Sequence, residues 1–350
     1  MARVLIVEDS PVMQRLLADI IRRGEGLEVA GIAADPYEAR ELVKSLKPDV
    51  MTLDVELPRM DGLTFLERLM RLHPMPVVMV SSQTERDAEA SLRALELGAV
   101  DVIAKPRAAD GHALIDFAAE IAERLRAAAR ADVGAREAAG RPARPGVLEG
   151  PADARALEGK LVAIGASTGG TEAIREVLAR LPARTPPVAI VQHMPEMFTR
   201  MFAKRLGEQC ELEVREAVDG EPLKAGHAYV APGNWHLSVK RVGKGFEARV
   251  AQGEAVNRHR PSVDVLFDSV AAAAGAAATA VILTGMGSDG AAGMRRIRAA
   301  GGHTLAQEEA SCVVFGMPKS AIEAGAVERV LPLGAIAERI VARARENAPP

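Results

Sequence analysis

Cysteine is scarce in this sequence, and so are long apolar runs and any surplus of positive charge. The two cysteines, Cys210 and Cys312, lie far apart and form no C-x-x-C pair, which argues against a disulfide framework or a zinc site. No apolar run approaches the roughly eighteen residues of a membrane span, and the N-terminal MARVLIVEDSP lacks the pattern of a signal peptide. The formal net charge of −3 gives no general reason to expect nucleic-acid binding. We therefore expect a soluble, cytoplasmic protein that neither enters the membrane nor binds nucleic acid.

The first part of the chain is a regular alternation of short apolar runs and amphipathic stretches. The apolar runs are rich in β-branched residues and predict strands, and the amphipathic stretches between them predict helices. Such alternation predicts an open, five-stranded parallel sheet covered on both faces, in a domain over residues 1–125. The expected strands are 3–7, 27–34, 49–55, 76–82 and 100–104, and the expected helices are 11–23, 36–47, 62–72, 86–98 and 112–130.

The composition changes after residue 125. Residues 126–157 are rich in Ala, Gly, Pro and Arg and almost empty of large apolar side chains, so we expect a flexible linker. Strand–helix alternation returns over residues 158–346 and predicts a second, larger α/β domain with three layers and a mostly parallel sheet. Three short runs in its middle, GHAYVAP, HLSVKR and FEARVAQ, are expected to form a small antiparallel insertion.

Polar residues follow several of the expected strands in the first domain. Glu8 and Asp9 end the first strand, Asp54 ends the third, Ser81 ends the fourth and Lys105 follows the fifth. Ligands of a parallel α/β sheet bind beyond the carboxyl ends of its strands, and carboxylate oxygens are the ligands that Mg²⁺ prefers. The pattern predicts a Mg²⁺ site in which Asp54 attacks phosphorus and becomes an acyl phosphate. Each residue alone also fits a structural role, for example as a helix N-cap.

Together, VLIVEDS, TLDVELPRMDG, VVMVSS and AKP resemble the receiver domain of two-component response regulators, a flavodoxin-like fold. The resemblance implies that Asp54 is the phospho-acceptor, that Glu8, Asp9 and Asp54 hold Mg²⁺, and that Ser81 and Lys105 contact the phosphoryl group. Two positions depart from the usual pattern. Val102 replaces a switch aromatic residue, and Glu8 replaces an aspartate, a difference of one methylene that should still permit metal binding.

A serine and a histidine follow two expected strands of the second domain. Ser167 lies in Gly165-Ala166-Ser167-Thr168-Gly169, a G-x-S-x-G directly after LVAIGA, and His193 follows PVAIVQ. Small neighbours would leave the serine hydroxyl exposed at the sheet edge, where the histidine could act as its base. Taken alone, the serine motif favours a helix N-cap or a phosphate-binding loop over a nucleophile.

The stretch AVILTGMGSDG contains a literal G-x-G-x-x-G after an expected strand, so a dinucleotide-binding loop is one interpretation. The other is that the glycines aim Asp289 at His193, where its carboxylate would orient the imidazole. The second interpretation gives one role to the residues at three strand ends, Ser167, His193 and Asp289. In this interpretation the Met286 backbone N–H is a candidate oxyanion donor. The order Ser…His…Asp differs from that of the α/β-hydrolases.

GASTGG, VQHMP, APGNWHLSV, HRPSVDVLF and LTGMGSDGA closely resemble the catalytic domain of the bacterial chemotaxis methylesterases. The resemblance implies Ser167 as nucleophile, His193 as general base and acid and Asp289 as orienting acid, with Thr168 and Met286 lining the site. It also implies an esterase without a cofactor that demethylates chemoreceptor glutamates, deamidates receptor glutamines and is phosphorylated by a chemotaxis histidine kinase. A binding module that is switched by phosphorylation but has no catalytic activity is the alternative.

Overall fold

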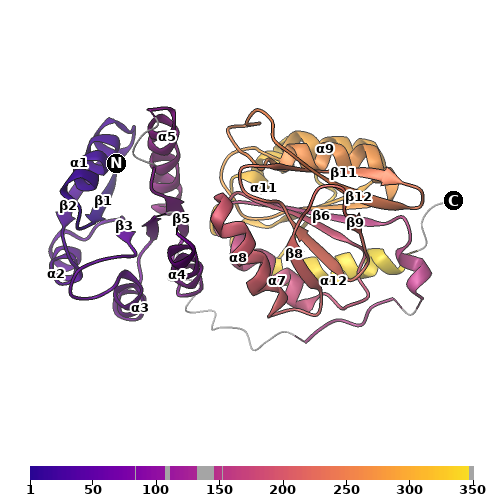
Figure 1. The fold of residues 1–350 in the computed structure, drawn as a ribbon, viewed down its shortest axis with the longest axis horizontal. Coiled ribbons are helices and arrows are strands. Elements are labelled where there is room, and N and C mark those ends of the chain that lie inside the picture. The colour runs from indigo at the N-terminus through magenta and orange to yellow at the C-terminus, as the bar shows by residue number, and fades with distance from the viewer. Residues whose placement is uncertain (83, 107–110, 132–145, 152, 347–350) are drawn as a thin grey trace. The chain divides into compact units, whose positions relative to one another are not determined.

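Figure 1 shows the fold in a computed structural model. The structure describes residues 1–350 except 83, 107–110, 132–145, 152 and 347–350. The chain forms two compact units, Met1–Arg141 and Pro142–Pro350. The last helix of the first unit reaches Ala128, slightly beyond the expected end of that domain. Residues 132–145 and 152 of the expected linker lie outside the described residues.

The first unit is a flavodoxin-like α/β sandwich, as the sequence predicts. Its strands pair in the order β2-β1-β3-β4-β5, and every pair is parallel. The strands are β1 (Ala2–Val7), β2 (Leu27–Ala33), β3 (Val50–Asp54), β4 (Val77–Ser81) and β5 (Asp101–Ala104), and the helices are α1 (Pro11–Arg23), α2 (Pro36–Leu46), α3 (Gly62–Leu72), α4 (Glu85–Glu96) and α5 (Gly111–Ala128).

The second unit is built on a seven-stranded parallel sheet of order β15-β14-β13-β6-β7-β10-β8. Helices α9 and α10 pack together over one face of the sheet, and α7 packs with α12 over the other (Figure 1). The strands are β6 (Leu161–Ala166), β7 (Val188–Gln192), β8 (Glu213–Glu216), β10 (His227–Val230), β13 (Ala278–Ile282), β14 (His303–Gln307) and β15 (Arg329–Leu331), and the helices are α7 (Gly170–Arg180), α8 (Glu196–Gly207), α9 (Val263–Ala274), α10 (Ala291–Ala299), α11 (Met317–Glu323) and α12 (Leu333–Arg345).

A small antiparallel sheet is present, but its composition differs from the prediction. Strands β11 (His236–Val242) and β12 (Gly245–Ala251) pair as expected, and the third strand is β9 (Pro222–Leu223). The run GHAYVAP, expected in this insertion, instead forms β10, which pairs in parallel with β7 and β8 in the main sheet. The complete burial of Ala228, Tyr229 and Val230 fits a strand covered on both faces of a parallel sheet, and the prediction was wrong because pairing partners depend on long-range topology.

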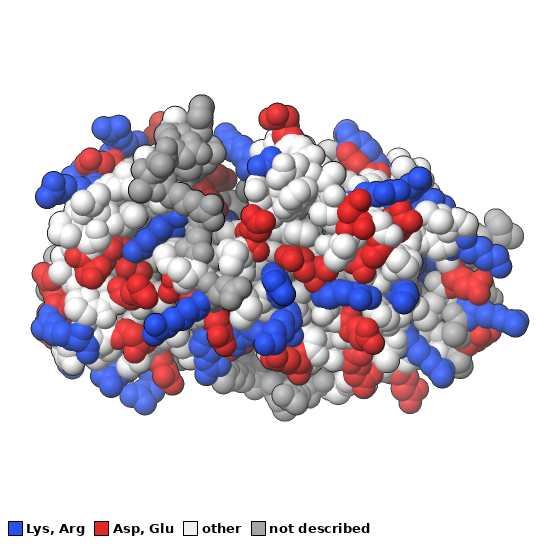
Figure 2. All heavy atoms as spheres, viewed as in Figure 1, with Lys and Arg blue, Asp and Glu red and all other residues white. Residues whose placement is uncertain are grey.

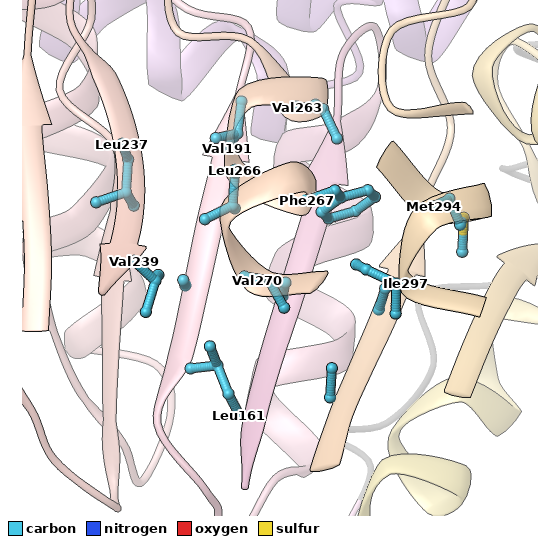
Figure 3. Packing of buried hydrophobic residues seen from close by; sticks show 14 of the residues in the cluster. Leu161, Val191, Leu237, Val239, Val263, Leu266, Phe267, Val270, Met294 and Ile297 are labelled. Carbon is cyan, nitrogen blue, oxygen red and sulfur yellow. The ribbon is translucent and has the colours of Figure 1, made fainter. Parts of the chain in front are cut away.

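Helix α9 carries much of the core that supports the main sheet. Its buried side chains Val263, Leu266, Phe267 and Val270 point toward the sheet, beside Met294 and Ile297 of α10 (Figure 3). Ser262 caps the helix, because its Oγ accepts a hydrogen bond from Val265 N. The N-terminus of α9 is thereby fixed over the strands that carry the candidate site.

The described helices include none that is both long and apolar enough to cross a bilayer. On the face drawn in Figure 2, basic and acidic side chains are interspersed over both units, without a broad area of one sign.

Candidate active site

Three neighbouring strands bring the predicted serine, histidine and aspartate to one edge of the main sheet. Strand β6 lies between β13 and β7, and all three run in parallel, so their carboxyl ends share an edge. Ser167 directly follows β6 and His193 directly follows β7, and the loop after β13 carries Asp289. Backbone hydrogen bonds connect these ends, from Ser167 N to Thr284 O at 3.1 Å and from His193 N to Ala166 O at 3.1 Å.

His193 and Asp289 form a buried pair. The His193 Nε2 lies 2.9 Å from the Asp289 Oδ2, and each side chain is about 2% exposed. Because an ionised carboxylate only accepts hydrogen bonds, Nε2 carries the proton and Nδ1 has a free lone pair in the neutral ring. The buried Nδ1 has no hydrogen-bond partner among the described residues. His193 therefore presents an unused basic nitrogen at the sheet edge, and in this conformation it does not bond to Ser167.

The Asp289 carboxylate lies at the N-terminus of α9 and accepts several further hydrogen bonds. Its Oδ2 accepts from Val263 N at 2.6 Å, and its Oδ1 accepts from Ser262 Oγ at 2.8 Å, from Asp264 N at 3.2 Å and from Asn257 Nδ2 at 2.7 Å. Burial alone would raise the pKa of Asp289, but the hydrogen bond and charge of His193 and these further donors hold the pKa well below its usual range. The carboxylate is therefore ionised and fixed toward the imidazole.

Glycines let the chain pass close to Ser167. Gly169, before α7, has φ +76°, a left-handed conformation that favours glycine. A Cβ on Gly285 would lie 2.8 Å from the Cβ of Ser167, so the first glycine of the G-x-G-x-x-G is needed for packing against the serine. The last, Gly290, has φ +93° and directly follows Asp289. The loop is thus explained by the candidate site, and the structure gives no support to the dinucleotide interpretation.

The alternative that Ser167 only caps a helix does not hold, because the N-cap position of α7 is Gly169. Thr168 is buried, and its backbone O accepts from Thr284 Oγ1 at 3.0 Å. Met286 is half-buried and follows Gly285, the residue in contact with Ser167. Thr168 directly follows Ser167, and Met286 directly follows Gly285 in the adjacent loop, and their roles in the site stay predictions.

Several residues that contact this site were not predicted from the sequence. Gln192 Nε2 donates to Ser167 O at 2.8 Å and to His193 O at 3.3 Å, so it links the backbones of both residues. The His259 ring stacks on the His193 ring with centroids 3.7 Å apart. Asn257 and Ser262 contact Asp289. Gln192 lies in VQHMP, and His259 and Ser262 lie in HRPSVDVLF, but these motifs assigned no role to them, and the Ser-Val-Asp start of a helix indicates an N-cap without showing which carboxylate the helix faces.

The predicted acidic residues of the first unit also come together. Carboxylate oxygens of Glu8, Asp9 and Asp54 lie within 4.8 Å of one another, a spacing that fits a cation with oxygen ligands. Lys105 Nζ lies 2.7 Å from Asp54 Oδ2 and 2.8 Å from Glu8 Oε2. Ser81 at the end of β4 is completely buried, and its Oγ donates to Ser82 O at 3.3 Å. Ser10, and not Asp9, caps α1, which leaves the Asp9 carboxylate for the cluster.

Burial dominates the electrostatics of this acidic cluster. It raises the pKa of both Glu8 and Asp54, although Lys105 partly offsets the effect. The pKa of Lys105 is also raised, because the hydrogen bonds and charges of the two acids outweigh its own desolvation. The cluster holds three acidic side chains and one lysine, Lys105. This composition suits a divalent cation.

Comparison with known proteins shows which families share these two sites. The profile of the CheB methylesterase matches residues 162–340, more than half of the chain, and that of the response regulator receiver domain matches residues 4–116. The chain belongs to the CheB methylesterase family. A protein-glutamate methylesterase/protein-glutamine glutaminase of Bordetella parapertussis is 55% identical over 97% of this chain and 97% of its own length.

Two further comparisons agree with this assignment. A homologue of the same name from Bordetella avium is 54% identical over 99% of this chain and 98% of its own length. The crystal structure of the Thermotoga maritima CheB methylesterase catalytic domain is 41% identical, with a TM-score of 0.51, and covers 52% of this chain and 97% of that chain. Family membership and the paired units together identify a receiver domain joined to a methylesterase domain.

Proposed function

We propose that this CheB-family protein hydrolyses glutamate γ-methyl esters on chemoreceptors, releasing methanol, and deamidates receptor glutamines, under the control of phosphorylation at Asp54. The observation that supports this proposal is the His193–Asp289 pair at 2.9 Å, whose remaining ring nitrogen, at the edge that Ser167 shares, has no hydrogen-bond partner among the residues that the structure describes. The protein would act in the cytoplasm, on the cytoplasmic helices of receptors within their arrays.

Ser167 is the proposed nucleophile. His193 Nδ1 takes the proton of the Ser167 hydroxyl, and Oγ attacks the γ-carbonyl carbon of the substrate to form a tetrahedral intermediate. The backbone N–H of Met286 is the candidate donor to the oxyanion. The bond from carbon to the methoxy oxygen, or to nitrogen in a glutamine, then breaks, and His193 returns its proton to give methanol or ammonia. Water, deprotonated by the same nitrogen, cleaves the acyl-serine ester and releases glutamate and Ser167.

Asp289 orients the base in this scheme. It holds the proton on Nε2 and stabilises the imidazolium that forms during each attack. The low pKa of Asp289 keeps its carboxylate ionised throughout, so the proton taken from Ser167 stays on His193.

In the receiver unit, Asp54 is the proposed acceptor of a phosphoryl group from a chemotaxis histidine kinase. The Asp54 carboxylate attacks phosphorus, and Lys105, now 2.7 Å from that carboxylate, is placed to pair with the phosphoryl oxygens, as is the Ser81 hydroxyl. Glu8, Asp9 and Asp54 would hold Mg²⁺, which when bound supplies positive charge next to the phosphoryl group. No cofactor is proposed for the ester hydrolysis.

The test is methanol release from methylated receptor membranes, with and without a small phosphodonor such as acetyl phosphate. We expect the donor to increase the rate for the wild-type protein but not for Asp54→Asn, and Ser167→Ala to lose activity by several orders of magnitude. If Ser167→Ala released methanol at the wild-type rate, the proposed nucleophile would be wrong. If Ser167→Ala kept the protein's signalling output while wild type released no methanol, the alternative of a binding module would be right.

A further inference from the structure

A tight turn of the loop before α9 lies against both Asp289 and a second buried acid. In this turn, Val256 N donates to His259 O at 3.1 Å and His259 N donates to Val256 O at 2.9 Å. The two residues between them, Asn257 and Arg258, have φ +51° and +67°, which is typical of a type I′ turn. The turn therefore presents Asn257 in a conformation that asparagine and glycine adopt more readily than other residues.

The side chain of Asn257 bridges two carboxylates. Its Nδ2 lies 2.7 Å from Asp289 Oδ1 and 2.7 Å from Asp264 Oδ2, so the two amide protons serve one acid each. Asp264 is itself buried, and its other oxygen accepts from Gly293 N at 2.7 Å, which fixes it at the start of α10. Two carboxyl groups thus lie on either side of a single donor, and burial together with the nearby charge of Asp289 raises the pKa of Asp264.

We propose that Asn257 is a positioning residue, whose one side-chain amide holds the Asp289 carboxylate in place for His193 against repulsion from Asp264. This inference rests on the proposed function of the triad. Removal of the amide leaves Asp264 Oδ2 facing Asp289 without a donor between them, although Ser262 Oγ and the backbone of Asp264 still bind Asp289. The expected defect is therefore in the orientation of the base, with substrate binding unchanged.

Two variants of Asn257 distinguish the effect of its side-chain amide from the effect of its turn conformation. Asn257→Gly keeps a residue that accepts φ +51° and deletes the amide alone, so we expect kcat to fall about tenfold with KM unchanged. Asn257→Asp also suits the turn but adds a third carboxylate, and we expect a larger loss, about a hundredfold. A role limited to turn formation predicts that Asn257→Gly has the wild-type kcat. Thermal unfolding of each variant confirms that the fold is intact.

Asn234→Gly is the matched control. Asn234, in the loop between β10 and β11, has φ +64°, and its Oδ1 accepts hydrogen bonds from Arg260, which directly follows the turn of Asn257, without contact to Asp289. We expect its kcat in methanol release to stay within about twofold of wild type. An equal defect in Asn234→Gly and Asn257→Gly, or a wild-type kcat in Asn257→Gly, would overturn the inference. Ser167→Ala is assayed in the same experiment. Activity in Ser167→Ala would contradict the proposed nucleophile. If Ser167→Ala is inactive and Asn257→Gly is fully active, only the role of Asn257 is contradicted.

Discussion

Replacement of Asp289 by asparagine is the substitution from which we expect a large loss of activity, because both oxygens of the carboxylate are in use. The wild-type carboxylate uses both oxygens as acceptors, Oδ2 for His193 and Val263 N and Oδ1 for Ser262, Asp264 N and Asn257. An asparagine offers only one acceptor oxygen. In one orientation its NH₂ faces the His193 ring and forces the proton onto Nδ1, which then cannot act as a base. In the other, the NH₂ faces the donors Asp264 N and Asn257 Nδ2.

The magnitude follows from these two orientations. Loss of the correct tautomer in a serine–histidine–aspartate triad costs about 10⁴ in kcat, or about 5 kcal/mol of transition-state stabilisation. The second orientation keeps the tautomer, but each buried donor left without an acceptor costs about 1–3 kcal/mol of folding free energy. The low pKa of Asp289 indicates that the site strongly favours an ion over a neutral group. We therefore expect kcat to fall by about 10³ to 10⁴ for Asp289→Asn, together with a lower melting temperature.

The assay is methanol release from methylated receptor membranes at saturating substrate, with circular dichroism to verify folding. Asp268→Asn is the matched control, because Asp268 lies on α9, the helix whose N-terminus contacts Asp289, and pairs with Arg296 in an exposed position. It should keep the wild-type rate. A folded Asp289→Asn protein with kcat within tenfold of wild type would refute the argument, since the orienting carboxylate would then be dispensable.

Three further predictions concern stability. Phe267→Ala should lower the free energy of unfolding of the second unit by about 3–5 kcal/mol in urea titrations, because its side chain is fully buried against the sheet; a loss below 1 kcal/mol would contradict that packing. Mg²⁺ at about 100 times its Kd should stabilise the receiver unit by about 2.7 kcal/mol in thermal unfolding, and Glu8→Gln should weaken this effect; equal stabilisation of both proteins would exclude Glu8 as a ligand. Because the pKa of Asp289 is lowered in the folded state, its ionisation contributes stability that is complete above about pH 4 and is lost as the pH falls toward the folded-state pKa. The free energy of unfolding should therefore decline less steeply with falling pH in Asp289→Asn than in wild type. Identical slopes for the two proteins would contradict this prediction.

Most of the fold was predictable because both units repeat a simple local pattern. Apolar runs such as LVAIGA and PVAIVQ are buried on both faces of a parallel sheet, and in such a sheet the carboxyl ends meet at one edge. The expected meeting of His193 and Asp289 follows from that geometry alone. Strand β10 was assigned to the wrong sheet, because pairing partners depend on long-range topology that a short run of residues does not encode.

The parts of the site that the sequence did not indicate are those that act through long-range contacts. Asn257 and Ser262 bind a carboxylate about thirty residues further along the chain, and His259 stacks on the ring of His193, which lies more than sixty residues earlier. Their residue types are ordinary for turns and helix caps, so the motif HRPSVDVLF, which contains His259 and Ser262, does not show which site residues they contact. The close packing of α9 on Gly165, where an added Cβ would lie 2.2 Å from Val263 Cγ1, is one long-range contact that brings this helix N-terminus to the site.

The central claim is that Ser167 and His193 act as one unit, and a double-mutant cycle tests it most directly. The cycle compares kcat for methanol release among wild type, Ser167→Ala, His193→Ala and the double variant. If the two residues share one proton transfer, either single change removes nearly all of the acceleration, and the double variant is no slower than the worse single variant. Losses that multiply in the double variant would show that the two side chains act independently, and the proposed catalytic site would be wrong.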